Sequence, residues 1–306
     1  SPATYIRYGD PRRIKRNDLR ALGRIILSSL KGLKITGEYT YNRTTEQNKF
    51  YKNKYQYIGM NFTGVLNSTE NSSYAVTSKY TDYNAVNLFA NYDMTFGKHD
   101  ISVMGGYNQE SSHTESQYSY RTDVVVGSLP SLSLSTGTPI TNDAFEEFAI
   151  RGLFYRVNYS YAGKYLLEAN GRYDGTSRFP KNSRFGFFPS FSAGWRISEE
   201  GFWKDNKVAD VVNSFKLRVG YGTTGNCNIS DYMYVTSFKE SDYPMNNTVG
   251  SPVYIVDETL GNKKLKWETM RSTNIGLDLS FFNSRLNITA EWYNNQVDNL
   301  LLKSVI

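Results

Sequence analysis

The sequence predicts an all-β fold: about ten strands of an antiparallel transmembrane β-barrel. Two observations predict it. Ten segments alternate apolar and polar residues with a period of two, which places successive side chains on opposite faces of a sheet. The connections between these segments alternate between tight turns and long loops, which is typical of membrane-spanning barrels. A barrel of this kind turns its apolar face to lipid and its polar face to a wet lumen.

The expected strands cover, in chain order, residues 18–30, 33–42, 85–96, 99–109, 147–161, 164–174, 185–197, 214–222, 270–282 and 285–295. In the segment 164–174, Tyr165 and Leu167 share one face, whereas Glu168 and Asn170 share the other. Several segments reach ten residues or more, against the usual five or six. Tilted strands need about 9–11 residues to cross a bilayer, so the lengths favour membrane-spanning strands.

The same alternation recurs along the chain. The apolar faces are formed, in order, by Leu88, Ala90, Tyr92, Met94 and Phe96; by Ile101, Val103, Gly105 and Tyr107; by Leu153, Tyr155, Val157, Tyr159 and Tyr161; by Phe187, Phe191, Ala193, Trp195 and Ile197; by Ile275, Leu277, Leu279 and Phe281; and by Leu286, Ile288, Ala290 and Trp292. The polar residues between them point to the opposite face, as expected for a sheet with one apolar and one polar face.

The connections sort into two kinds. Residues suited to hairpin turns stand at 31–32, 97–98, 162–163 and 283–284. Long links cover 43–84, 110–146, 175–184 and 223–269, and the link 198–213 is of moderate length. Compact water-soluble domains rarely contain several structureless links of this length. This asymmetry is an independent argument for a barrel.

Composition restricts the other classes of protein. Only 39% of residues are hydrophobic, mean hydropathy is −0.52, and no run of 18 apolar residues exists, which excludes a helical membrane protein. Aromatic residues make up 15%, a level that suits membrane girdles, interfaces or sugar-binding surfaces, although β proteins are often rich in aromatics. The single Cys227 excludes an internal disulfide framework. The net charge of +6 is spread along the chain, which indicates a solvated surface and no nucleic-acid partner.

No motif for catalysis, metal or cofactor stands out. Gly220, Gly222 and Gly225 form a G-x-G-x-x-G, but the residues that follow are turn-like and a dinucleotide site needs a helix there. His99 and His113 lack partners at the spacing of a triad or a zinc site. The acidic pairs 146–147 and 199–200 are expected to be solvated. We therefore expect no cofactor, no metal and no enzymatic activity.

One stretch is specific. Residues 174–203 read DGTSRFPKNSRFGFFPSFSAGWRISEEGFW, which resembles the barrel signature of SusC/RagA-type TonB-linked outer-membrane transporters of Bacteroidota. The resemblance continues through the blocks at 215–226, 265–268, 274–278, 281–287 and 298–302. The blocks span about residues 147–302 in the expected order, and the first 146 residues fit by strand pattern only.

The resemblance implies a 22-stranded barrel in the outer membrane, plugged by an N-terminal domain. It implies uptake of glycans or peptides with a SusD-like surface lipoprotein, powered by the TonB system. By the same logic, residues 1–306 would be an internal part of the barrel domain, without plug, signal peptide or closing C-terminal strands. Such a segment has two unpaired edges, so we expect its structure either to show part of a larger assembly or to leave the barrel edges unclosed.

The candidate site residues are of two kinds. Polar residues expected to line the lumen and the substrate path are Arg156, Asn158, Glu168, Asn170, Arg172, Asp278 and Glu291. In the loops, Arg178 and Arg184 can pair with lumen or loop carboxylates, and pinning neighbouring loops is favoured over direct contact with substrate. Trp267, at the end of the longest loop, suits an interfacial anchor or a sugar-stacking platform, and the anchor is favoured.

Two other classes of protein remain open at this point. The first is a water-soluble or surface-exposed all-β module for carbohydrate binding or adhesion, which would use the aromatic faces. The second is a glycoside hydrolase, which would need two carboxylates held about 5–10 Å apart.

Overall fold

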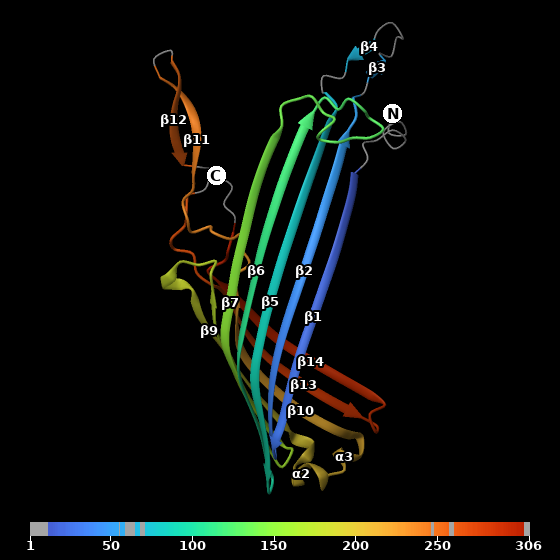
Figure 1. Ribbon diagram of the computed structural model, residues 1–306. Helices are drawn as coiled ribbons and strands as arrows, with labels where there is room; N and C mark the ends of the chain where they lie inside the picture. The colour runs from blue at the N-terminus through green and yellow to red at the C-terminus, as the bar shows by residue number, and fades with distance from the viewer. Residues whose placement is uncertain are drawn as a thin grey trace. The chain divides into compact units, whose positions relative to one another are not determined.

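A computed structural model describes residues 12–54, 56–58, 65–67, 71–245, 248–256 and 260–302. Ten strands form one antiparallel sheet in chain order, so each strand pairs with the next one along the chain (Figure 1). These strands are β1 (Arg12–Leu30), β2 (Leu33–Lys52), β5 (Ser73–Phe96), β6 (His99–Thr122), β7 (Ile140–Tyr161), β8 (Tyr165–Thr176), β9 (Phe185–Arg196), β10 (Val212–Asn226), β13 (Glu268–Phe281) and β14 (Leu286–Asp298). All ten predicted strands are present. β1 and β14 are the edges of the sheet, which is unclosed as expected.

The chain divides into two compact units. One consists of Ser1–Leu22, Thr40–Asn84 and Ser112–Glu147, and the other of Gly23–Tyr39, Ala85–Ser111 and Phe148–Ile306. The second unit holds the strands with the clearest alternation and all the candidate site residues.

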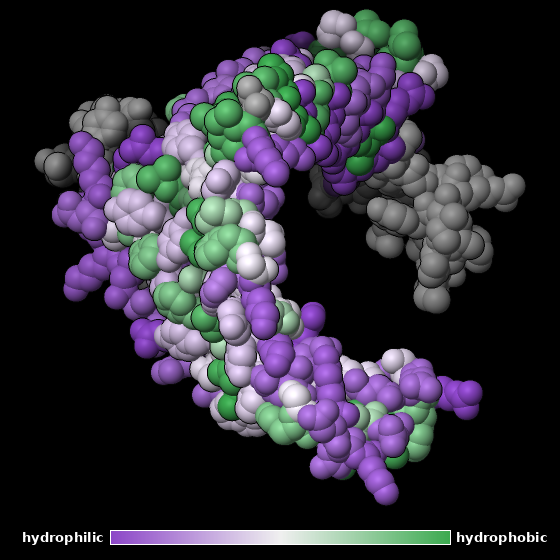
Figure 2. Space-filling model, turned by 90° about the horizontal axis from the view of Figure 1, so that it is seen from below, coloured by the Kyte–Doolittle hydropathy of each residue, from purple (hydrophilic) through white to green (hydrophobic). Residues whose placement is uncertain are grey.

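In the second unit, the strand register aligns one apolar face across six strands. Tyr159 of β7 pairs with Leu167, Leu167 with Ala193, and the row continues through the following strands to Val219, Ile275 and Trp292. These side chains are not buried under other protein: Leu167 is 52% and Trp292 57% exposed. Figure 2 shows such hydrophobic side chains on the surface. Water would penalise this arrangement, whereas lipid favours it.

The opposite face of the same strands is polar. Asn158 pairs with Glu168 and Glu168 with Ser192, and the row continues through Gly220 and Asn274 to Tyr293. Because the side-chain period of a strand is two, one register fixes both rows at once. The pairing therefore confirms the apolar and the polar face predicted from the sequence.

The tight turns lie where the sequence predicts them. Gly32, Gly97 and Gly163 have positive φ angles of 81°, 58° and 67°, a backbone region that costs glycine little. The link between β9 and β10 instead holds three short helices: η2 (Ile197–Glu199), α2 (Gly201–Lys204) and α3 (Val208–Val211). No helix in the described part of the chain could cross a bilayer.

In the first unit, several strands run further than predicted. β2 continues to Lys52 instead of ending at residue 42, and β6 continues to Thr122 instead of 109; β5 and β7 begin 12 and 7 residues earlier than predicted, at Ser73 and Ile140. The extensions carry polar residues on both faces, so the alternation that identifies a strand is lost there. Hydrogen bonds between side chains tie them into the sheet: the Thr81 and Thr114 hydroxyls lie 3.0 Å apart, and Asp82 accepts a bond of 2.8 Å from Tyr41 Oη in the predicted part of β2.

The predicted long links are correspondingly shorter and partly structured. The short hairpin β3 (Gln56–Ile58) and β4 (Val65–Asn67) lies within the first of them, and the hairpin β11 (Phe238–Met245) and β12 (Thr248–Val256) within the last. Reading 43–84, 110–146 and 223–269 as structureless throughout was therefore wrong.

Candidate functional site: the polar face of the sheet

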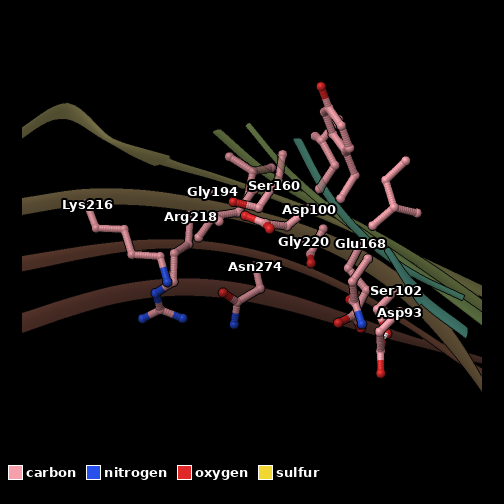
Figure 3. Close-up of a pocket in the computed structure, with 18 of the residues that line it drawn as sticks. Asp93, Asp100, Ser102, Ser160, Glu168, Gly194, Lys216, Arg218, Gly220 and Asn274 are labelled. Atoms are coloured by element: carbon pink, nitrogen blue, oxygen red, sulfur yellow. Dashed lines mark hydrogen bonds between the residues drawn. The ribbon is translucent and has the colours of Figure 1, made fainter. Parts of the chain in front are cut away.

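The polar face of the second unit borders a hollow of about 730 Å³. Eight strands contribute to its lining, from β5 to β10 and β13 and β14, because residues two apart on each strand point to the same side. Figure 3 shows Lys216, Arg218 and Asn274 extending from neighbouring strands toward one side of the sheet. The polar lining includes Asp93, Asp100, Ser102, Asn158, Ser160, Glu168, Ser192, Lys216, Arg218, Asn274 and Glu291.

One group of the predicted lumen residues forms a connected cluster on β7 and β8. The Asn170 amide donates to Glu168 Oε1 at 2.7 Å, and Arg156 Nε lies 4.0 Å from the same oxygen. Arg156 is paired with Asn170 in the strand register, and Asn158 with Glu168. The four residues are thus brought together, with both charge signs present. Arg156 and Glu168 are 51% and 37% exposed, so this exposed ion pair is expected to stabilise the fold by at most about 1 kcal/mol.

A second cluster spans β10, β13 and β14 around Arg218. Its guanidinium donates two hydrogen bonds to Asp278, at 2.8 and 3.1 Å, and lies 3.8 Å from Glu291. Thr289 Oγ1 donates to the same Asp278 carboxylate at 3.3 Å. Gly276 provides the space for the Arg218 side chain, since a Cβ at this position would lie 2.8 Å from the guanidinium. The planar, two-pronged pairing fixes the orientation of Arg218 toward both carboxylates.

Arg218 was not among the predicted site residues, nor was its neighbour Lys216. Both share the parity of the polar face of β10, and the predicted strand 214–222 contains them. Their position opposite Gly276 and Asp278 depends on the register between β10 and β13, which are separated by 41 residues of loop. The alternation along a strand is enough to place such residues on the polar face. It does not predict which residue each of them contacts.

Arg172 takes a different partner from the rest of the predicted group. Its guanidinium donates two hydrogen bonds of 2.8 Å to Asp174, two residues along the same strand. It also lies over the Phe154 ring, 5.5 Å from the centroid, which gives a cation–π contact. Arg172 is therefore held near the β7–β8 rim and does not join the two clusters.

The loop residue Arg178 pins neighbouring loops together. Its Nε donates to Asp231 at 2.7 Å, and its guanidinium lies 4.3 Å from the Phe148 ring centroid. This pairing with a loop carboxylate was expected. Arg184 instead donates to the Phe179 backbone carbonyl at 3.1 Å.

Trp267 lies inside the protein, at the centre of a rim cluster formed by Phe179, Phe188 and Trp267. The indole is 9% exposed and makes edge-to-face contacts with both phenyl rings at 5.5 and 5.1 Å. Its Nε1 donates to the Arg184 carbonyl at 2.8 Å. An anchor in lipid and a sugar platform both need an exposed indole, so in this structure Trp267 has neither position and packs the loops instead.

The glycines of the G-x-G-x-x-G lie within β10, not in a phosphate-binding turn. Gly225 has a structural task, because a Cβ at this position would collide with the Phe188 ring of the rim cluster. No group of three or more His, Cys, Asp or Glu side chains among the described residues is arranged to hold a metal ion.

Glu200, in the link between β9 and β10, holds that link against the sheet. Its carboxylate lies 2.9 Å from Lys164 Nζ and accepts hydrogen bonds from Trp195 Nε1, at 3.2 Å, and from Tyr165. These donors favour the charged form, so they lower the pKa of Glu200 from its usual 4.5 to about 2.

A pH dependence follows from this depressed pKa. The contribution of Glu200 to stability is fully present above about pH 4.5 and is lost as the pH falls through about 2. Urea unfolding should therefore show Glu200→Gln to be less stable than the parent at pH 7, with the difference shrinking between pH 4.5 and 2. Glu199→Gln is the matched control, since Glu199 bonds to the exposed Lys204, whereas Glu200 bonds to three partners, so the effect of Glu199→Gln should be smaller. A Glu200→Gln effect that stays constant down to pH 2 would contradict this assignment.

The exposed apolar face, the wet polar face and the alternation of turns and loops define the wall of a membrane-spanning β-barrel. The sequence matches the model of the family described as "TonB dependent receptor-like, beta-barrel" over residues 3–305, and the chain belongs to this family. It is similar to the TonB-dependent receptor P3 of Formosa agariphila, with 31% identity over 70% of this chain and 21% of that protein. It is also similar to the TonB-dependent receptor SusC of Bacteroides thetaiotaomicron, with 31% identity over 76% of this chain and 23% of that protein.

A solved structure described as the RagAB peptide transporter shares the fold. Its TM-score is 0.85 with 20% identity, over 99% of this chain and 32% of that chain. The present chain therefore spans between about a fifth and a third of the proteins it matches.

Proposed function

We propose that the chain is part of the barrel wall of a TonB-dependent outer-membrane importer of large polar nutrients, oligosaccharides or peptides. The importer works with a SusD-like surface lipoprotein and draws its energy from the TonB system. The observation that carries the proposal is the exposed apolar row from Leu167 to Trp292, backed by a charged and hydrogen-bonding face in the same register.

The polar face suits the passage of such solutes. Arg156, Glu168 and Asn170 offer donors and acceptors of both signs, as does the cluster of Arg218, Asp278 and Glu291. Sugar hydroxyls and peptide groups are satisfied by this mixture. Arg172 and Asn158 belong to the same polar face, while Arg178 and Arg184 shape the loops above it. The role of these residues is solvation of the path and loop positioning, without covalent chemistry.

Growth on defined nutrients tests the proposal. Deleting the full-length gene should abolish growth on one class of oligosaccharide or peptide and leave growth on the corresponding monomers unchanged, because small solutes do not need an active importer. Restoring the gene in trans is the control for effects on neighbouring genes. Unchanged growth on every polymer tested would refute nutrient import. Recovery of the receptor in the soluble fraction without detergent would instead favour a soluble all-β binding module.

A further inference from the structure

The link between β9 and β10 differs from the other turns at its end of the sheet, which are two to four residues long. This helical insert, residues 197–211, contains η2, α2 and α3 and lies next to the start of β10 (Figure 1). It presents exposed hydrophobic side chains: Phe202 is 63%, Val208 45% and Val211 44% exposed. Ordinary polar turns do not carry such residues.

The insert is fixed to the apolar face of the sheet rather than to the polar one. The Trp203 ring packs edge-on against Phe215 at 5.2 Å, and Phe215 stands opposite Leu279 in the apolar rows. Glu200 accepts hydrogen bonds from Trp195 and Tyr165, which pair with each other on the same face. Trp203 Nε1 donates to the Val212 carbonyl at 3.2 Å. The ring contact with Phe215 and the Glu200 hydrogen bonds thus hold the insert on the side that we assign to lipid, and the bond to the Val212 carbonyl ties it to the start of β10.

A belt of rings crosses the apolar face at the same end. Phe96 stacks on His99 at 4.9 Å, His99 contacts Tyr161 at 4.9 Å, Tyr161 stacks on Tyr165 at 6.4 Å, and Tyr165 on Trp195 at 6.3 Å. This ring belt runs over β5, β6, β7, β8 and β9 and ends at the insert. Tyrosine and tryptophan gather where a membrane surface meets water, so the belt places that surface at the level of the insert.

We propose that the helical insert is a membrane-surface anchor, which lies in the headgroup region of the lipid leaflet at the tight-turn end and inserts Phe202 between phospholipids. This inference rests on the proposed function, because it needs the apolar face to be in lipid. The shape of α2 agrees with it. Phe202 and Lys204 are two residues apart, about 200° around a helix, so one points to lipid while the other, 56% exposed and paired with Glu199, points to water. An exposed aromatic opposite a charged face is the pattern of interfacial helices.

Nitroxide labelling of the whole receptor in vesicles of phosphatidylethanolamine and phosphatidylglycerol tests the anchor. With Cys227 and any other native cysteine replaced by serine, single labels are introduced through Phe202→Cys, Lys204→Cys and Leu167→Cys. All three side chains are exposed, so the substitutions are compatible with folding. The accessibility of each label to oxygen, relative to a water-soluble nickel chelate, reports its depth in the bilayer.

The ratio is expected to rise in the order Lys204, Phe202, Leu167. A Phe202 label as water-exposed as the Lys204 label, with Leu167 still deep, would overturn the anchor and leave the barrel assignment intact. Water-like values at all three positions would overturn the barrel assignment itself. The free nitroxide label in water serves as the reference for full water exposure. Heat-modifiable migration on gels confirms that each variant is folded.

Discussion

Arginine at Leu167 is expected to destabilise the folded barrel by about 1–3 kcal/mol, since a lipid-facing charge costs about 2–4 kcal/mol at the bilayer midplane and less toward the membrane surface. Leu167 lies on the apolar face of β8, two residues inside the ring belt at Tyr165, and is paired with Tyr159 and Ala193. Its side chain is 52% exposed. In water, arginine at so exposed a position would cost little. The size of the penalty therefore distinguishes lipid from water around this face.

Asn170→Arg is the matched control. Asn170 is on the same strand, three residues away and on the polar face, where it bonds to Glu168. Its replacement should be mild because the added charge stays in a wet environment. Urea unfolding of the receptor refolded into phospholipid vesicles measures both variants, and Leu277→Arg should repeat the Leu167 result on β13. Equal tolerance of arginine on the two faces would be incompatible with a lipid-facing surface.

Strands with one apolar face could be predicted from the sequence. The alternation from Leu153 to Tyr161 and from Tyr165 to Tyr173 is the direct result of one lipid-facing and one water-facing side, so element and face are both readable. The same signal disappears in the extensions of β2, β5, β6 and β7, whose two faces are both polar. There, hydrogen bonds such as that between the Thr81 and Thr114 hydroxyls join the strands, and the two-residue alternation of hydropathy gives no information about them.

The candidate site was predictable in part for a related reason. The alternation along each strand assigns Arg156, Glu168 and Asp278 to the polar face. The residue that each one contacts depends on the strand register and on which strands the long loops bring together. Arg218 meets Asp278 only because β10 and β13 are brought together across a loop of 41 residues. For Trp267, the position in the sequence suggested the wrong environment. A tryptophan near a membrane boundary fits an anchor by position, and its burial becomes evident only when Phe179 and Phe188 converge on it from other segments.

Replacing Trp267 by alanine is expected to cost about 3–5 kcal/mol, as is usual when a buried aromatic side chain is removed. Trp267 contacts both Phe179 and Phe188, and its Nε1 bonds to the Arg184 carbonyl. The rim cluster also joins distant segments, since Ser183 Oγ donates to the Leu265 carbonyl at 2.7 Å. Loss of the indole should therefore release the loops around 177–184 and 260–267 while the strands below them remain paired.

Limited proteolysis of the receptor in vesicles separates this packing role from a surface role. Cleavage within 177–184 and 260–267 should become faster in Trp267→Ala than in the parent, because the loops lose their common core. Trp267→Phe keeps most of the ring packing and loses the hydrogen bond to Arg184, so it should cost only about 0.5–1.5 kcal/mol and leave cleavage nearly unchanged. If the indole were a lipid anchor, the pattern would differ: Trp267→Ala and Trp267→Phe would leave the loops equally protected from proteolysis. Equal protection in both would therefore mean that the rim does not depend on this cluster.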